Sequence, residues 1–137
     1  MNAEKIRRVS QIKNENDISY DVRGAAFKVH SALGPGLLES VYETSLSFEL
    51  RELDYEVLNQ VGVPMVYKDI KFETGYRLDI LVNDLVIIEI KSVEALNDVH
   101  HKQLLTYLKL SDKKLGLLIN FNSASLKNSI VRIVNNL

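Results

Sequence analysis

Two oppositely charged residues interrupt an otherwise apolar stretch of this 137-residue chain. The segment Ile87–Lys91 (IIEIK) reads as a buried β-strand, in which Glu89 and Lys91 point to the same face. Burying one of these charges alone is costly, and burying both requires a compensating partner. An E-x-K triplet is short and common, and by itself it favours an ordinary charge pair at a solvated strand end. The triplet therefore becomes informative only together with its neighbours.

The preceding stretch carries a second acid in an apolar setting. Asp79 lies within Arg77–Val82 (RLDILV), although Asp is depleted in strand interiors. Two carboxylates on adjacent strands suit a hard cation such as Mg²⁺, which takes oxygen ligands and keeps several waters. Such a cation activates water and polarises a phosphodiester, while Lys91 would orient the water or offset transition-state charge. We favour this metal site over the alternative, an Asp79 hydrogen-bonded in a bulge or paired with Arg77.

The turn between these two strands decides whether the acids can meet. Directly opposed residues of an antiparallel pair share a face, and their numbers add to a constant set by the loop. A regular two-residue loop at 83–84 gives an odd sum, which places Asp79 and Glu89 on opposite faces. A shared ion requires an even sum. We therefore predict a β-bulge or an odd-length loop, preferably 82–84 with Asp84 in the left-handed region.

These residues together resemble a known superfamily of nucleases. Asp79 on one strand, followed by Glu89-x-Lys91 on the next, is similar to the pattern of the PD-(D/E)xK nuclease superfamily. Leu78 stands where the superfamily name has Pro, a position at which that Pro is often absent. The resemblance implies that Asp79 and Glu89 bind the metal, with the backbone carbonyl of Ile90 as a further ligand, and that Lys91 is the catalytic lysine.

Two further motifs extend the resemblance over about residues 18–137. Gln103 and Tyr107 are similar to the Q-xxx-Y motif of the RecB-like branch, and their spacing puts them on one helix face. Upstream, Gly36, Glu39 and Tyr42 resemble the signature of the GxxExxY protein family. The resemblance implies that Glu39 is a metal ligand or holds a water, and that Gln103 and Tyr107 support the site or contact the scissile phosphate. For Gly36 and Tyr42 we favour a helix-start glycine and a core aromatic.

The surrounding pattern predicts one α/β domain of the restriction-endonuclease-like kind, with a mixed central β-sheet flanked by helices in the order ααβββαβα. Period-two or apolar runs predict strands near 61–67, with an edge or bulge at Pro64, and near 70–82, 85–92 and 115–121. Helices are predicted at 17–33 and 99–110, capped by Asp17 and Asp98, at 37–53, and after Ser123 or Ser125. We assign residues 1–16 to an N-terminal arm and 17–137 to the nuclease-like domain.

Composition limits the class of protein. No apolar run approaches the ~18 residues of a membrane helix, no signal peptide is visible, and cysteine is absent, which excludes disulfides and thiolate metal sites. We therefore predict a cytoplasmic protein without membrane association. The net charge of −1 argues against a protein that coats nucleic acid through bulk positive charge, although it allows a local basic groove.

The leading interpretation is a metal-dependent nuclease that hydrolyses phosphodiester bonds of nucleic acid, with DNA favoured over RNA. The cofactor implied is Mg²⁺, with Mn²⁺ as an alternative. The competing function is a non-catalytic nucleic-acid-binding or scaffold module on the same fold, against which the intact acids and lysine count. The small size is compatible with a homodimer, since one domain offers limited surface for gripping a duplex.

Overall fold

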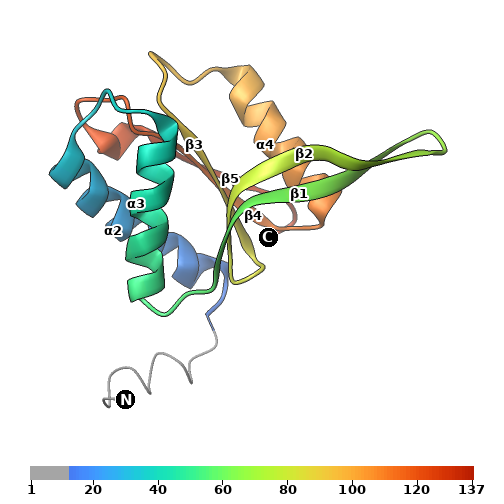
Figure 1. Ribbon diagram of the computed structural model, residues 1–137, viewed down its shortest axis with the longest axis horizontal. Coiled ribbons are helices and arrows are strands. Elements are labelled where there is room, and N and C mark those ends of the chain that lie inside the picture. Colours follow the sequence, from blue (N-terminus) through green and yellow to red (C-terminus); the bar gives the residue numbers. More distant parts are fainter. Residues whose placement is uncertain (1–12) are drawn as a thin grey trace.

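A five-stranded mixed sheet with the strand order β1-β2-β3-β4-β5 forms the centre of the molecule (Figure 1). The computed structural model describes residues 13–137, apart from the side chain of Thr74. Only β3 and β4 pair in parallel, and the other neighbouring strands are antiparallel. The strands are β1 (Val57–Tyr67), β2 (Ile70–Val82), β3 (Val86–Lys91), β4 (Leu115–Asn120) and β5 (Ile130–Val134).

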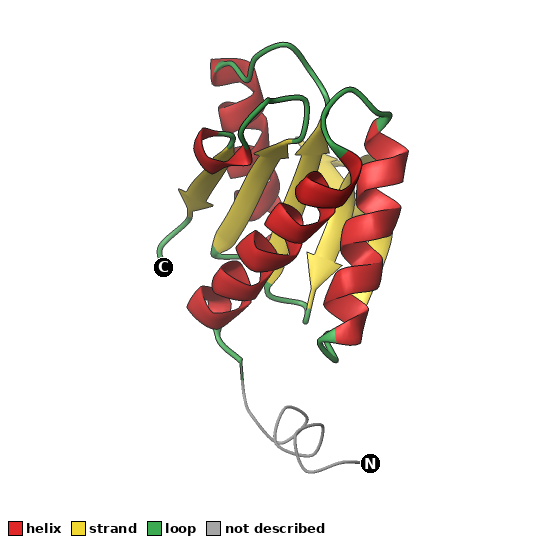
Figure 2. Ribbon diagram, turned by 90° about the vertical axis from the view of Figure 1, so that its left-hand side faces the viewer, coloured by secondary structure: helices red, strands yellow, loops and turns green. Residues whose placement is uncertain are grey.

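Helices cover both faces of this sheet, as the α/β prediction requires (Figure 2). Helices α2 (Glu15–Leu33) and α3 (Glu39–Glu52) pack against each other and cover one face. Helix α4 (Asp98–Ser111) lies on the other face and links the parallel strands β3 and β4, which need a crossover connection. No helix in residues 13–137 is long and apolar enough to cross a membrane.

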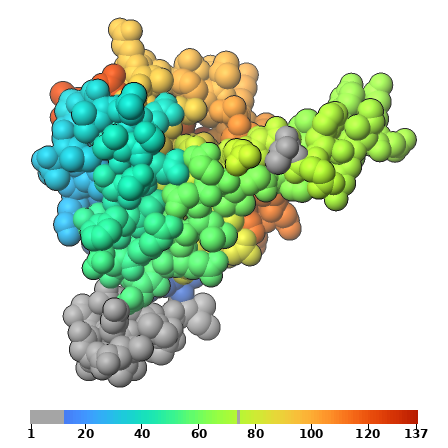
Figure 3. All heavy atoms as spheres, in the orientation of Figure 1, coloured from blue at the N-terminus to red at the C-terminus, as the bar shows by residue number. Residues whose placement is uncertain are grey.

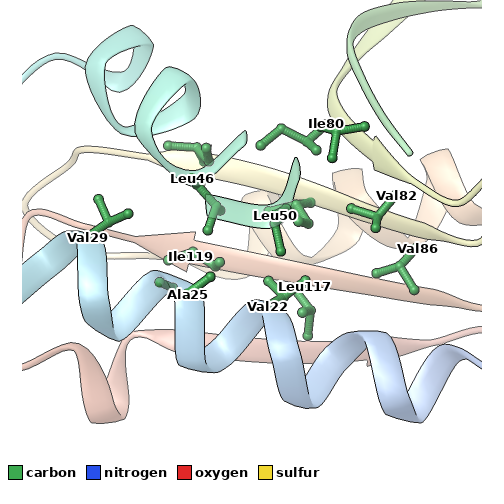
Figure 4. Packing of buried hydrophobic residues seen from close by; sticks show 14 of the residues in the cluster. Val22, Ala25, Val29, Leu46, Leu50, Ile80, Val82, Val86, Leu117 and Ile119 are labelled. Atoms are coloured by element: carbon green, nitrogen blue, oxygen red, sulfur yellow. The ribbon is translucent and has the colours of Figure 1, made fainter. Parts of the chain in front are cut away.

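Two hydrophobic clusters hold the layers together, one on each face of the sheet. The larger lies between the sheet and helices α2 and α3, and the close-up in Figure 4 shows Val22, Ala25 and Val29 of α2 beside Leu46 and Leu50 of α3. The smaller lies under α4. Its buried members are Leu78, Leu81, Ile87, Leu104, Leu108 and Leu118. The sheet is thus buried on both faces, which explains the nearly continuous apolar composition of β3 and β4.

The helix starts differ slightly from the prediction. Asn14, not Asp17, is the N-cap of α2, and Asp17 is the third helical residue of a capping box, its carboxylate accepting from the Asn14 amide at 3.1 Å. Asn97, not Asp98, caps α4 and accepts from the amides of Val99 and His100. In both cases an Asn precedes the acidic residue by one or three positions, and Asn and Asp are about equally good N-caps.

The predicted final helix is wrong, because the segment forms β5 instead. Only a short 3₁₀ turn, η1 (Leu126–Asn128), precedes β5, which pairs antiparallel with β4. The buried strand β4 leaves backbone donors and acceptors on its outer edge that need partners. The β-branched run Ile130–Val134 supplies them, with Val131 and Ile133 packed against the cluster under α4. The order in the described chain is therefore ααβββαββ.

Strands β1 and β2 continue beyond the sheet as a hairpin that projects from the body of the molecule (Figures 1 and 3). The predicted irregularity at Pro64 is confirmed by a register shift between Val63 and Met65. Gly75 is required there, since a Cβ at this position would lie 2.4 Å from the Cβ of Met65. The apolar side chains near the tip are largely exposed. They are Val66, Tyr67, Ile70 and Phe72.

Tyr42 fastens the loop between α2 and α3, which is the role expected of a core aromatic. Its fully buried ring stacks on Phe121 at 4.5 Å, while its hydroxyl donates to the carbonyl of Gly34 at 2.6 Å and accepts from the amide of Leu37 at 3.1 Å. Gly34 and Gly36 adopt φ values of 71° and 91°, a region that favours glycine. The loop thus starts α3 at a fixed angle to the sheet.

Tyr42→Phe should lower the free energy of unfolding by about 1–3 kcal/mol, because two backbone groups lose their buried partner. Tyr20→Phe is the matched control, since Tyr20 is 80% exposed and its hydroxyl is solvated. Urea denaturation followed by circular dichroism measures both variants. Equal stability of the two variants would show that the hydroxyl of Tyr42 does not hold the loop.

Candidate active site

The turn between β2 and β3 brings Asp79 and Glu89 to the same level of the sheet. Val82 pairs with Val86, and the numbers of every opposed pair in this ladder add to 168, so the predicted even sum is confirmed. The loop is 83–85, one residue later than preferred, with Asn83 and Asp84 both left-handed at φ 51° and 55°. Val82 and Val86 are both fully buried and form the last rung of the ladder in place of Leu81 and Leu85.

The backbone ladder between β2 and β3 stops where the two acids lie opposite each other. The last paired residues before them are Ile80 and Ile88. From there the side chains replace the backbone carbonyls as acceptors: Oε1 of Glu89 accepts from the Asp79 amide at 3.3 Å, and Oδ2 of Asp79 accepts from the Ile90 amide at 2.8 Å. Each carboxylate thus accepts a hydrogen bond from a backbone amide of the neighbouring strand. These bonds join β2 and β3 beyond the end of their backbone ladder.

Glu89 is the buried member of this pair, with only 6% of its surface exposed. Burial, the neighbouring charge of Asp79 and a hydrogen bond with Asp79 raise the pKa of Glu89 to about 9. The Asp79 backbone amide and the positive charge of Lys91 act in the opposite direction but are outweighed. A pKa of about 9 keeps the Glu89 carboxyl protonated at neutral pH beside Asp79, an arrangement typical of two carboxylates that meet in a poorly solvated site.

Tyr107 of α4 faces the same pair of acids. Desolvation is the largest cause that raises its pKa, followed by the charges of Glu89 and Asp79, while a hydrogen bond with Gln103 lowers it. Tyr107 also stacks on Tyr76 of β2, with ring centroids 4.2 Å apart, and this stacking fixes the ring beside the acids. The structure thus places Gln103 and Tyr107 on the side of α4 that was predicted.

The acidic residues of α3 approach the site from the opposite side. Oε1 of Glu39 accepts from the amide of Ser92 at 3.3 Å, next to Lys91. Glu43, one turn later, accepts from the side-chain amide of Gln60 at 2.7 Å, and the same nitrogen donates to Oδ1 of Asp79 at 3.3 Å. Sequence reasoning missed this link. Glu43 shares the helix stripe of Glu39, which is the signal that could have found it, but nothing in the sequence points to Gln60.

The donor set of Asp79 and Glu89 fits a hard cation. Both side chains are carboxylates, and a divalent ion bound between them would displace the proton of Glu89. No group of three or more His, Cys, Asp or Glu side chains in residues 13–137 is arranged to hold a metal, so Glu39 does not complete a three-acid site. Mg²⁺ does not need one, since it is often bound by one or two carboxylates plus waters and substrate phosphates.

Of the three histidines, His30 and His100 have structural partners, whereas Nε2 of His101 is buried without a hydrogen-bond partner among the described residues. A ring nitrogen of His30 makes a hydrogen bond of 2.7 Å with the carbonyl of Ser123. Nδ1 of His100 accepts from the backbone amide of Asn97 and so completes the capping box of α4. The adjacent His101 does not take part in this cap through its side chain. Neither belongs to a group that could hold a metal within residues 13–137.

A family model of the PD-(D/E)XK nuclease superfamily matches residues 16–133 of the chain. Comparison with curated proteins and with solved structures gave no match. The matched range contains all six side chains of the candidate site and most of both hydrophobic clusters. The narrower resemblance, to the GxxExxY family and to the RecB-like Q-xxx-Y motif, stays a prediction.

The raised pKa of Glu89 gives the metal-free protein a distinct dependence on pH. The folded state keeps the Glu89 proton up to about pH 9, whereas the unfolded chain releases it near the ordinary value of 4.5. Stability from this group is therefore complete below about pH 4.5 and is lost as the pH rises toward 9. We expect a loss of at least about 2 kcal/mol between pH 5 and pH 9 in the presence of a chelator.

Glu89→Gln should flatten this pH dependence, because a neutral side chain cannot ionise in the buried site. Glu94→Gln is the control, since Glu94 is exposed. Chemical denaturation at several pH values measures all three proteins. A wild-type slope that survives in Glu89→Gln would assign the effect to another group.

Proposed function

Because the chain belongs to the PD-(D/E)XK nuclease superfamily, we propose that it is a metal-dependent nuclease that hydrolyses phosphodiester bonds in nucleic acid, with DNA as the favoured substrate. The observation that carries this proposal is the pair of acids, Asp79 and Glu89, opposed where the ladder between β2 and β3 opens. A cation shared there would lie near Lys91 and Tyr107, both of which interact electrostatically with the acids.

Asp79 and Glu89 would hold Mg²⁺, or Mn²⁺ in its place, with the carbonyl of Ile90 as a further ligand. When bound, the cation supplies a Lewis acid that polarises the phosphodiester and makes a water molecule more acidic. Glu89 must give up its proton before it can bind, so cation binding releases a proton at neutral pH. Lys91, on the same face of β3 as Glu89, is suited to orient the attacking water or to offset charge on the phosphate.

Residues of two helices would support these groups. Tyr107 lies near both acids and makes a hydrogen bond with Gln103, and both side chains would contact a phosphate oxygen. Glu39 lies beside Lys91 through its contact with the Ser92 amide, where it would hold a water rather than coordinate the cation directly.

The arrangement of charges favours catalysis over the alternative of a non-catalytic binding or scaffold module. A scaffold gains nothing from a buried Glu89 whose carboxyl must remain protonated beside Asp79, since an apolar residue there would stabilise the fold. Two meeting carboxylates also repel the phosphate backbone unless a cation lies between them. The pair therefore supports metal-dependent chemistry over binding alone.

Lys91→Ala should reduce cleavage at least ~100-fold, because the cation and its ligands remain while the positive charge beside the phosphate is lost. Asp79→Asn should abolish cleavage, and Lys114→Ala, which removes an exposed lysine, should leave it unchanged. The assay compares single- and double-stranded DNA and RNA with Mg²⁺, with Mn²⁺ and with a chelator. A wild-type protein without metal-dependent cleavage of any of these substrates would favour the scaffold function.

We also propose that two copies associate through the hairpin of β1 and β2. A two-stranded ribbon is only marginally stable without a covering layer, and Tyr67, Ile70 and Phe72 are 60%, 58% and 42% exposed on it. A net charge of −1 gives two copies little reason to repel each other. A second copy would cover this face and widen the surface that grips a duplex.

Ile70→Lys should convert such a dimer to a monomer, because it places a charge within the apolar face. Lys71→Ala is the control, since Lys71 pairs with Val66 and so lies on the other face of the hairpin. Light scattering after size-exclusion chromatography measures the mass of each protein. A wild-type chain that is monomeric at micromolar concentration contradicts the dimer and leaves the nuclease proposal unaffected.

A further inference from the structure

At Gln60, the side chains of strand β1 change from one face of the sheet to the other. The side-chain amide of Asn59 donates to Glu43 and Ser47 of α3 at 3.1 and 2.8 Å, on one face. Val61 packs in the cluster under α4, on the other face. Residues two apart in a regular strand share a face, so the chain must rotate between them. Gln60 lies at this rotation and has the left-handed φ of 52°.

Strand β2 makes the same change directly opposite. Ile80 belongs to the cluster under α2 and α3, whereas Leu78 belongs to the cluster under α4. The side chains of β2 therefore change from one face of the sheet to the other at Asp79. Pairing of Asn59 with Ile80 on one side and of Val61 with Leu78 on the other places Gln60 opposite Asp79. Two polar residues thus face each other at the point where both strands leave one core and enter the other.

The side chain of Gln60 joins this crossing point to α3. Its Nε2 donates to Oε1 of Glu43 at 2.7 Å and to Oδ1 of Asp79 at 3.3 Å. The other oxygen of Asp79, Oδ2, accepts from the Ile90 amide at 2.8 Å. Both oxygens of Asp79 are therefore held, one by the neighbouring strand and one by an amide that Glu43 anchors from the helix.

The backbone conformation of Gln60 indicates what its side chain is for. A left-handed conformation is unfavourable for residues with a Cβ, and Gly or Asn adopts it at lower cost. A hinge that served the backbone alone would be better built with one of these two residues. Only a longer amide, however, can reach a carboxylate on α3 and a carboxylate on β2 with the same nitrogen.

We propose that Gln60 is a positioning residue for Asp79, anchored by Glu43, and that this link sets the affinity of the candidate site for its divalent cation. The inference rests on the metal site proposed above. Carboxylates that bind metals are commonly fixed by a hydrogen bond from a neighbouring group, and loss of such a group typically weakens binding 10–100-fold. Glu43 acts through Gln60 and not as a ligand, in agreement with the absence of a three-acid group in residues 13–137.

Gln60→Asn separates this role from a purely structural one. Asn suits the left-handed backbone better than Gln, so thermal stability without metal should be equal or higher. Its shorter side chain cannot reach both carboxylates, so affinity for Mn²⁺ should fall about tenfold. Titration followed by the electron paramagnetic resonance of free Mn²⁺ measures this without reference to cleavage. Affinity within twofold of wild type would overturn the positioning role.

Variants of Glu43 test whether it works through Gln60. Glu43→Ala removes the acceptor and should weaken Mn²⁺ binding about as much as Gln60→Asn, whereas Glu43→Gln keeps an acceptor oxygen and should remain close to wild type. The double variant Glu43→Ala with Gln60→Asn should bind no more weakly than either single variant. Glu39→Ala is the control, because its effect should add fully to that of Gln60→Asn.

The outcomes distinguish this inference from the proposed function. If the wild type binds no Mn²⁺ at millimolar concentration, the metal site itself is wrong and the positioning role falls with it. If the wild type binds and the effects of Glu43→Ala and Gln60→Asn are additive, the metal site stands and the link through Gln60 is overturned. Equal loss in Glu43→Gln and Glu43→Ala would assign the effect of Glu43 to its charge and would likewise overturn the link.

Discussion

The opposition of Asp79 and Glu89 across β2 and β3 is the constraint on which the rest of the site depends. It is set by the three-residue turn 83–85, because a turn one residue shorter would send every side chain of β3 to the other face. The core fixes that turn in place, since Val82 and Val86 on either side of it are fully buried and pair with each other. Hydrophobic packing thus determines where two carboxylates meet.

Burying Glu89 beside Asp79 costs free energy, and the packing of the neighbouring residues offsets this cost. A buried Glu89 beside Asp79 opposes folding at neutral pH, since one of the two must hold a proton. The flanking residues Ile80, Ile88 and Ile90 are almost completely buried, and their packing outweighs this cost. Sites that oppose the stability of a fold are expected where function requires them. The pair therefore has no structural explanation, which supports the proposal above that it binds a metal.

Most of the fold was predictable because its elements have strong local patterns. Helices α2, α3 and α4 and strands β2 to β4 follow apolar periodicity with clear turn residues, and parity reasoning alone required the even register of Asp79 and Glu89. The C-terminal segment was not predictable in this way. Ile130, Ile133 and Val134 are spaced for a helix as well as for a strand, and only the open edge of β4 decides between them. The open edge of β4 arises only in the tertiary structure, so the local sequence does not reveal it.

The residues around the acids show a second limit of the same kind. Asp79, Glu89 and Lys91 stood out because charge is unusual in apolar strands. Gln60 did not, because a polar residue in an exposed strand is ordinary. Its importance comes from a backbone rotation that neither strand reveals alone, and from a contact with Glu43, which is 17 positions away in the chain. Long-range polar contacts carry no periodic signal, so they appear only once the elements are placed.

The site occupies the boundary between the two hydrophobic clusters, and this position explains how both faces of the sheet can serve it. Leu78 and Ile80, on either side of Asp79, belong to different clusters. A carboxylate at that boundary is within reach of α3 through Gln60, while Glu89, opposite it, lies close to Tyr107 on α4. In a regular strand Asp79 would face one layer only. The rotation of β1 and β2 therefore gives the pair of acids partners on both helices, which the sheet otherwise keeps apart.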